Sequence, residues 1–239
     1  MIIGNDVKEK IGTTPEGVIL TIGDFDVLPQ YQGTLVKSLN RLVERGTLKR
    51  LSKGKYYKPR KTIFGTLKPA PEEITKDFME KNGKIIGYIT GNSAFASMGL
   101  TTQITSSLMI GTNIYRRPLE RGGYNISFLL QRNPITEENI PLLRILDAIK
   151  LIRDIPATNP DAIIGQLGCM IKGLDKDRQT LLLTLAENYT PYVRALLGAT
   201  MELNNLDTGN LMYSLNGTTS YKLPITEAAL PNKQNWNIL

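Results

Sequence analysis

The sequence predicts a mixed α+β protein, and three observations favour this class. Short apolar runs with strand-like alternation occur in the first 135 residues. Apolar residues at helical spacing dominate residues 136–239. Glycine and proline separate the runs at short intervals, as in a chain of several small elements. We therefore expect three regions, at 1–62, at 63–135 (mixed α/β) and at 136–239 (helical, with a terminal hairpin).

The composition is that of an ordinary globular protein, with 41% hydrophobic and 21% charged residues. No run approaches the eighteen or so consecutive apolar residues of a membrane-spanning helix, and residues 1–6 do not resemble a signal peptide. The single cysteine, Cys169, cannot form an internal disulfide, and its apolar surroundings predict a buried side chain. These features predict a cytoplasmic protein with no membrane partner.

The chain contains no histidine, and this excludes much of enzyme chemistry. Serine or cysteine nucleophiles lack their usual base, and a zinc site lacks its usual ligands. No phosphate-binding or dinucleotide-binding glycine motif is present either. Asp147, Lys150 and Asp161 could be assigned to a carboxylate-dependent nuclease, but an acid and a lysine one helical turn apart usually form a surface pair. We therefore predict no catalytic residues, metal or cofactor.

Positive charge is concentrated in one short segment. The chain carries +7, whereas residues 37–61 alone contain ten basic residues and one acid, Glu44, for a charge of +9. The rest of the chain therefore sums to −2. Such a concentration is typical of a surface that binds a polyanion, although a solvated basic face is the alternative.

A helix over residues 35–46 would divide this segment into two faces. Its core face would carry an apolar stripe, and Gly46 would supply the left-handed residue that ends it. The apolar stripe consists of Leu35, Val36, Leu39, Leu42 and Val43. The opposite face carries Thr34, Lys37, Ser38, Arg41 and Arg45. Cations beside small hydroxyls suit contacts with phosphates and with base edges.

Two short strands, at 47–51 and 55–59, follow this helix around a Ser52-Lys53-Gly54 turn. They predict a β-hairpin with basic side chains at Lys49, Arg50, Lys53, Lys55 and Lys58. Upstream we expect a helix at 5–11, a strand at 18–22 and a short helix capped by Asp24. This order of elements predicts a winged helix-turn-helix at 1–62 that binds DNA.

The remaining elements follow from periodicity and caps. We expect a helix from Pro71 to about Asn82 that stops at Gly83, a short helix at 93–98, and strands at 84–89, 107–112 and 124–131. Four helices follow. Asn159 and Asp175 cap the second and third, and Thr190-Pro191 opens the fourth. Asn216-Gly217 predicts a type I′ hairpin within 211–223. The apolar helix faces would form a bundle or a groove for a protein partner.

Part of the chain resembles a known family. The run at 39–59, followed by Phe64-Gly65 and Pro69 and then by the segments 91–94 and 99–103, resembles the AbiE-type (type IV) antitoxins, in the branch of uncharacterised winged-helix proteins. The resemblance covers roughly residues 5–130. It implies a repressor whose winged helix binds double-stranded DNA at its own promoter. It also implies that the remaining chain neutralises a nucleotidyltransferase-like toxin.

Two other interpretations remain open at this stage. One is a stand-alone winged-helix regulator whose C-terminal region dimerises or binds a ligand. The other is the carboxylate-dependent nuclease. A nucleotidyltransferase reading frame beside the gene would favour the antitoxin.

Overall fold

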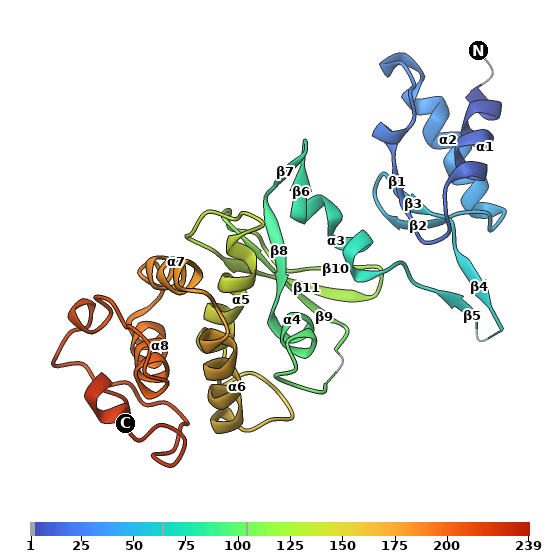
Figure 1. Ribbon diagram of the computed structural model, residues 1–239. Helices are drawn as coiled ribbons and strands as arrows, with labels where there is room; N and C mark the ends of the chain where they lie inside the picture. Colours follow the sequence, from blue (N-terminus) through green and yellow to red (C-terminus); the bar gives the residue numbers. More distant parts are fainter. Residues whose placement is uncertain (1–2, 64, 104) are drawn as a thin grey trace. The chain divides into compact units, whose positions relative to one another are not determined.

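The computed structural model describes residues 3–63, 65–103 and 105–239, and it confirms a mixed α+β protein (Figure 1). Phe64, one of the residues that carry the family resemblance, lies outside the described residues. The chain forms two compact units, the first comprising Met1–Asp77 with Leu119–Asn125 and the second Phe78–Pro118 with Ile126–Leu239. These units do not coincide with the boundaries expected at residues 62 and 135.

Two helices and a three-stranded antiparallel sheet form most of the first unit. The elements are α1 (Ile3–Thr13), β1 (Ile19–Thr21), the 3-10 turns η1 (Ile22–Asp24) and η2 (Pro29–Tyr31), α2 (Gln32–Glu44), β2 (Lys49–Ser52) and β3 (Lys55–Tyr57). The strand order is β1-β3-β2. Both helices and the sheet bury one apolar core, made of Val7, Ile11, Leu20, Phe25, Leu35, Leu39, Leu48 and Tyr56.

Helix α2 ends as the sequence predicts. Gly46 has φ +72°, and its N–H donates to Val43 O while Thr47 N–H donates to Leu42 O, which is the Schellman arrangement. The expected cap at Asp24 was wrong. Its carboxylate accepts from the backbone N and the Oγ1 of Thr21, at 2.6 and 2.8 Å, and therefore closes the short turn η1, of which Asp24 is the last residue.

The first unit also contains β4 (Arg60–Thr62), β5 (Gly65–Leu67), most of α3 (Pro71–Met79) and β10 (Leu119–Arg121). Helix α3 ends at Met79, earlier than expected. Asn82 and Gly83, with φ 52° and 73°, form the two-residue turn between β6 (Glu80–Lys81) and β7 (Lys84–Ile85). Positive φ at both positions is the geometry of a type I′ turn, so Gly83 belongs to a hairpin instead of ending a helix.

The second unit contains β8 (Gly87–Thr90), α4 (Gly91–Ser97), β9 (Ser107–Thr112), most of β11 (Tyr124–Leu130), α5 (Asn139–Lys150), α6 (Pro160–Lys172), α7 (Lys176–Ala186) and α8 (Pro191–Leu203). The four-stranded sheet has the order β10-β11-β9-β8. Tyr88, Phe95 and Leu100 share one buried core with α5–α8. The middle region and the C-terminal helices therefore form one folded unit.

The predicted starts of α6, α7 and α8 are confirmed. Asn159 accepts from Asp161 N, Asp175 accepts from Arg178 N, and Thr190 precedes the proline that opens α8. The expectation that the Cys169 side chain is buried was wrong, because the side chain is exposed. Helix α6 turns Ile164, Leu167 and Ile171 into the core, and position 169 falls on the opposite face.

The predicted terminal hairpin was also wrong. The tail contains the 3-10 turns η3 (Met212–Ser214) and η4 (Lys233–Trp236), and Tyr221 forms a parallel bridge with Ile238. Neither Asn216 nor Gly217 has the positive φ of a type I′ turn, and the Asn216 side chain instead accepts from Thr218. Fully buried Trp236 packs where a side chain at Gly198 of α8 would lie, so the tail folds onto α8. Within the described residues, no helix is long and apolar enough to cross a membrane.

Candidate nucleic-acid interface

The outward face of α2 carries the polar residues that the sequence assigns to DNA. Thr34, Lys37, Arg41 and Arg45 are exposed, and Ser38 is half-buried. Apart from the neighbours Lys37 and Ser38, successive residues of this set are three or four positions apart, so the set lies along one side of the helix. Leu35 and Leu39 on the opposite side are fully buried, and they fix which face is presented to solvent.

The cations on this face are free to bind an external anion. Within the described part of the chain, Lys37, Arg41 and Arg45 form no ion pair with a carboxylate. At a rise of 1.5 Å per residue, α2 is about 20 Å long, and an α-helix fits the roughly 12 Å wide major groove of duplex DNA. The face can therefore reach phosphates at its ends and base edges at its centre.

The β2–β3 hairpin adds more exposed cations. Lys49 and Arg50 on β2 are exposed, and Lys53 is exposed at the turn beside Gly54, which has φ +72°. The register shifts between Arg50 and Ser52, and the Arg50 Nε donates to Ser52 O at 3.4 Å. The hairpin predicted from the sequence is present, with its basic tip at Lys53.

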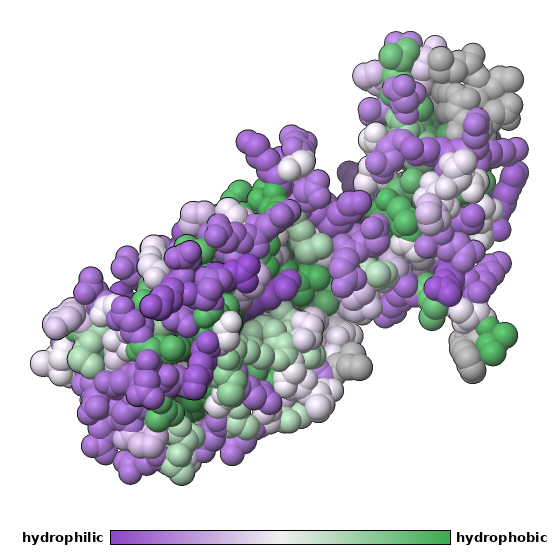
Figure 2. Space-filling model, in the orientation of Figure 1, coloured by the Kyte–Doolittle hydropathy of each residue, from purple (hydrophilic) through white to green (hydrophobic). Residues whose placement is uncertain are grey.

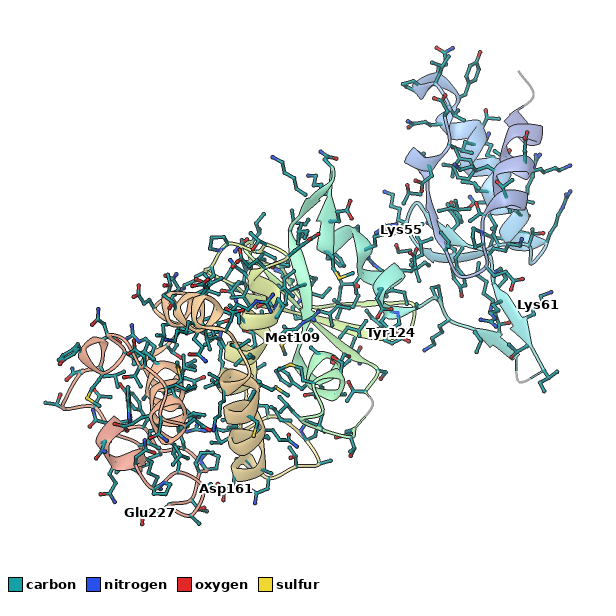
Figure 3. All side chains as sticks on the ribbon, in the orientation of Figure 1. Lys55, Lys61, Met109, Tyr124, Asp161 and Glu227 are labelled. Atoms are coloured by element: carbon teal, nitrogen blue, oxygen red, sulfur yellow. The ribbon has the colours of Figure 1, made fainter. Side chains whose placement is uncertain are left out.

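One residue expected at the interface has another role in the unit. The Lys55 Nζ lies 2.6 Å from Asp77 Oδ2, and the Arg121 Nη1 lies 2.6 Å from Asp77 Oδ1 (Figure 3 labels Lys55). Burial works to raise the pKa of Asp77, but the hydrogen bonds from Lys55 and Arg121 outweigh it and leave the pKa lowered. The Lys58 side chain is half-buried.

The second unit contains a buried polar cluster that the sequence did not reveal. Asp147 of α5 is fully buried instead of pairing with Lys150 at the surface. Tyr88 Oη and Thr90 Oγ1 each donate to Asp147 Oδ2 at 2.7 Å, and Tyr189 Oη donates to Oδ1 at 2.8 Å. The one available signal was its position within the apolar run of α5, between Leu146 and Ala148.

Gln131 extends this cluster. Its Nε2 donates to the hydroxyl oxygens of Tyr88 and Tyr189, at 2.9 and 2.8 Å, and its Oε1 accepts from Asn133. Burial raises the pKa of Asp147, and the three hydroxyl donors oppose the rise without cancelling it. The pKa of both tyrosines is also raised by burial. The cluster satisfies its own hydrogen bonds, which is the pattern of a structural network.

The two carboxylates considered for a nuclease, Asp147 and Asp161, form hydrogen bonds with different residues. Asp161 accepts from the backbone N and the Oγ1 of Thr226, at 2.9 and 2.7 Å. Within the described ranges, no group of three or more potential acidic, cysteine or histidine ligands could hold a metal ion.

Two cavities of the second unit meet at Lys150. One, of about 330 Å³, is lined by Gln131, Arg132, Lys150 and Tyr189 among others. The other, of about 520 Å³, is lined by Lys150, Arg153, Tyr192, Tyr221 and Lys222 among others. Arg132 and Lys150 are the charged residues of the first lining, and in the second Lys150, Arg153 and Lys222 outnumber one acid, Asp154.

Comparison with known proteins places the chain in a family. Residues 6–153, more than half of the chain, match a family described as "Family of unknown function (DUF6088)". The chain belongs to the DUF6088 family. The matched segment covers the first unit from residue 6 onward and the second unit to just beyond the end of α5. The curated proteins contain no match to the chain.

This DUF6088 chain is similar in fold to a solved protein of Mycobacterium tuberculosis, described as "Crystal structure of RV2827C protein". The TM-score is 0.53 at 14% sequence identity, over 92% of this chain and 84% of the other. At this identity the likeness concerns the fold alone.

Proposed function

We propose that the chain is a DNA-binding transcriptional repressor whose first unit is a winged helix-turn-helix. In this proposal α2 is the recognition helix and the β2–β3 hairpin is the wing. The observation that carries it is the exposed face of α2, where Lys37, Arg41 and Arg45 have no ion-pair partner among the described residues, in the same unit as the exposed basic hairpin.

The position of each cation suggests its role. Arg41 lies near the centre of the outward face, where a guanidinium can bind the O6 and N7 of guanine with two hydrogen bonds. Lys37 and Arg45 lie on either side of it, and Lys49, Arg50 and Lys53 lie on the hairpin, where contact with phosphates is favoured. Lys55 is excluded from the proposed surface because Asp77 holds its ammonium group.

DNA binding is tested with the full chain and a labelled duplex carrying its own promoter. If five to six phosphates are neutralised, the logarithm of the association constant should fall with the logarithm of the salt concentration at a slope of about −5. The chain should also repress a reporter under that promoter. Affinity that does not change between low and physiological salt would contradict the proposal, as would an unrepressed reporter.

We further propose that this repressor is the antitoxin of a type IV toxin–antitoxin pair. The support is the resemblance of residues 39–59 and of the segments that follow them to AbiE-type antitoxins. In this role the second unit would neutralise a nucleotidyltransferase-like toxin. Cells that express such a toxin from the neighbouring gene should grow when the full chain is co-expressed. Continued arrest at verified expression of both proteins would contradict the antitoxin role.

The alternative is a stand-alone regulator that responds to a small ligand. The two cavities that meet at Lys150 favour it, because Arg132, Arg153 and Lys222 give their linings a positive character. The absence of a nucleotidyltransferase gene beside this one, together with promoter repression, would favour this alternative.

A further inference from the structure

Strands β4 and β5 form a separate two-stranded hairpin after the proposed wing. Arg60 pairs with Leu67, Lys61 with Thr66 and Thr62 with Gly65, and Thr62 Oγ1 donates to Gly65 O at 2.9 Å. The two strands form a sheet of their own. Within the first unit the hairpin extends away from the β1-β3-β2 sheet (Figure 1), and Lys61 labels its position in Figure 3. The sequence did not predict this element.

Both faces of this hairpin lie in solvent. Arg60, Lys61, Gly65, Thr66 and Leu67 are all exposed, and Thr62 is half-buried. A two-stranded hairpin without a packed face is only marginally stable in water. A partner that covers the hairpin would therefore stabilise it.

An apolar side chain lies at the end of the hairpin. Ile63 is 93% exposed at this end, whereas Leu67, 47% exposed, lies opposite Arg60 at the other end of the strand pair. Figure 2 shows hydrophobic surface on this hairpin. An aliphatic side chain this exposed at the end of a projecting basic hairpin is accessible to a partner.

The charge of the hairpin indicates which partner it fits. Residues 58–68 contain Lys58, Arg60, Lys61 and Lys68 and no acidic residue. Because successive strand residues point to opposite faces, Arg60 and Lys61 place one cation on each side of the ribbon. A groove of duplex DNA has a phosphate backbone along each of its two walls, which matches this arrangement.

We propose that the β4–β5 hairpin is a second DNA-binding arm that enters the minor groove and inserts Ile63 between base pairs. Arg60 and Lys61 contact the two backbones, and the aliphatic tip partly unstacks one base step, which bends the duplex. The arm follows β3 after only Lys58 and Pro59, so it lies on the same folded unit as the proposed recognition helix. This inference rests on the proposed DNA binding.

The arm is tested in the full chain by binding and bending measured on the same promoter duplex. Fluorescence transfer between dyes at the two DNA ends reports the bend, and anisotropy reports the affinity. Ile63→Ser should abolish the bend and weaken binding about tenfold, as expected when one aliphatic side chain loses its burial. The salt slope should stay unchanged, because no charge is lost. Arg60→Ala and Lys61→Ala should each reduce the slope by about one.

Ile114→Ser is the matched control, because Ile114 is also exposed, at 67%, but lies in the second unit. It should leave both affinity and bend unchanged, and thermal unfolding should be the same for both serine variants. If the wild-type chain binds the duplex and the Ile63→Ser variant bends it equally, the proposed insertion of Ile63 is contradicted. The proposal that α2 binds DNA is then unaffected. If the wild-type chain does not bind duplex DNA, both proposals fail.

Discussion

The ammonium group of Lys55 lies 2.6 Å from the carboxylate of Asp77, although the sequence places Lys55 beside the exposed Lys53 at the tip of a basic hairpin. The Lys55 side chain is only 18% exposed, whereas Lys53 is exposed to solvent. Two neighbouring cations of one hairpin therefore have different roles, one within the fold and one available to a partner.

We predict that Lys55→Met lowers the free energy of unfolding by about 0.5–1 kcal/mol, the range for a partly exposed ion pair. Because the pKa of Asp77 is lowered, the pair stabilises the fold fully at pH values above the ordinary carboxyl pKa. This contribution is lost as the pH falls through the lowered pKa of Asp77. The stability difference should therefore shrink in acid. Urea unfolding at several pH values measures it.

Lys53→Met provides the comparison. It should leave stability unchanged and reduce the salt slope of DNA binding by about one, whereas Lys55→Met should hardly change that slope. Equal effects of the two substitutions on DNA binding would mean that Lys55 leaves Asp77 to contact DNA.

We predict that Asp147→Asn destabilises the second unit by about 1–3 kcal/mol, because an amide leaves some of the three hydroxyl donors without an acceptor. The raised pKa of Asp147 means that the folded chain holds this proton more tightly than the unfolded chain. Its contribution to stability should therefore decline as the pH rises above the ordinary carboxyl pKa. The asparagine variant should lack that decline.

Chemical unfolding between mildly acidic and neutral pH tests this, with Asp177→Asn as the control because Asp177 is exposed on α7. The control should follow the wild-type curve. An Asp147→Asn protein with wild-type stability and pH dependence would mean that the cluster does not hold the core together.

We predict that Cys169 reacts with a thiol reagent in the native protein, because its side chain is exposed on α6. The native and unfolded chains should react at rates within about tenfold of each other, since exposure governs access to the thiol. Protection by several orders of magnitude in the native state would instead support the buried position that the sequence predicted.

The local sequence predicted elements best where caps and periodicity agreed. Helix α2 and the starts of α6, α7 and α8 are examples, because each is determined by residues within one or two turns. The two Asn-Gly pairs show the limit. Asn82-Gly83 forms a type I′ turn and Asn216-Gly217 does not, and the Asn216 carbonyl instead accepts from Asn237 Nδ2, far along the chain.

Long-range pairing explains most of the remaining differences. Asp147 is buried because Tyr88, Thr90 and Tyr189, each more than forty residues away, supply its hydrogen bonds. The pairing of Lys55 with Asp77 also depends on how α3 folds beside β3. Neither contact leaves a periodic signal in the sequence. The exposed face of α2 could be predicted because a single helix determines it.

The most direct test of the DNA-binding account compares Arg41→Lys and Arg41→Ala on the promoter duplex and on a scrambled duplex of the same composition. Lysine keeps the charge but cannot form the two parallel hydrogen bonds of a guanidinium. We predict that Arg41→Lys costs about 1–3 kcal/mol on the promoter and little on the scrambled duplex, while Arg45→Lys changes neither. Equal losses on both duplexes, or no loss on either, would contradict the assignment of α2 as the helix that recognises bases.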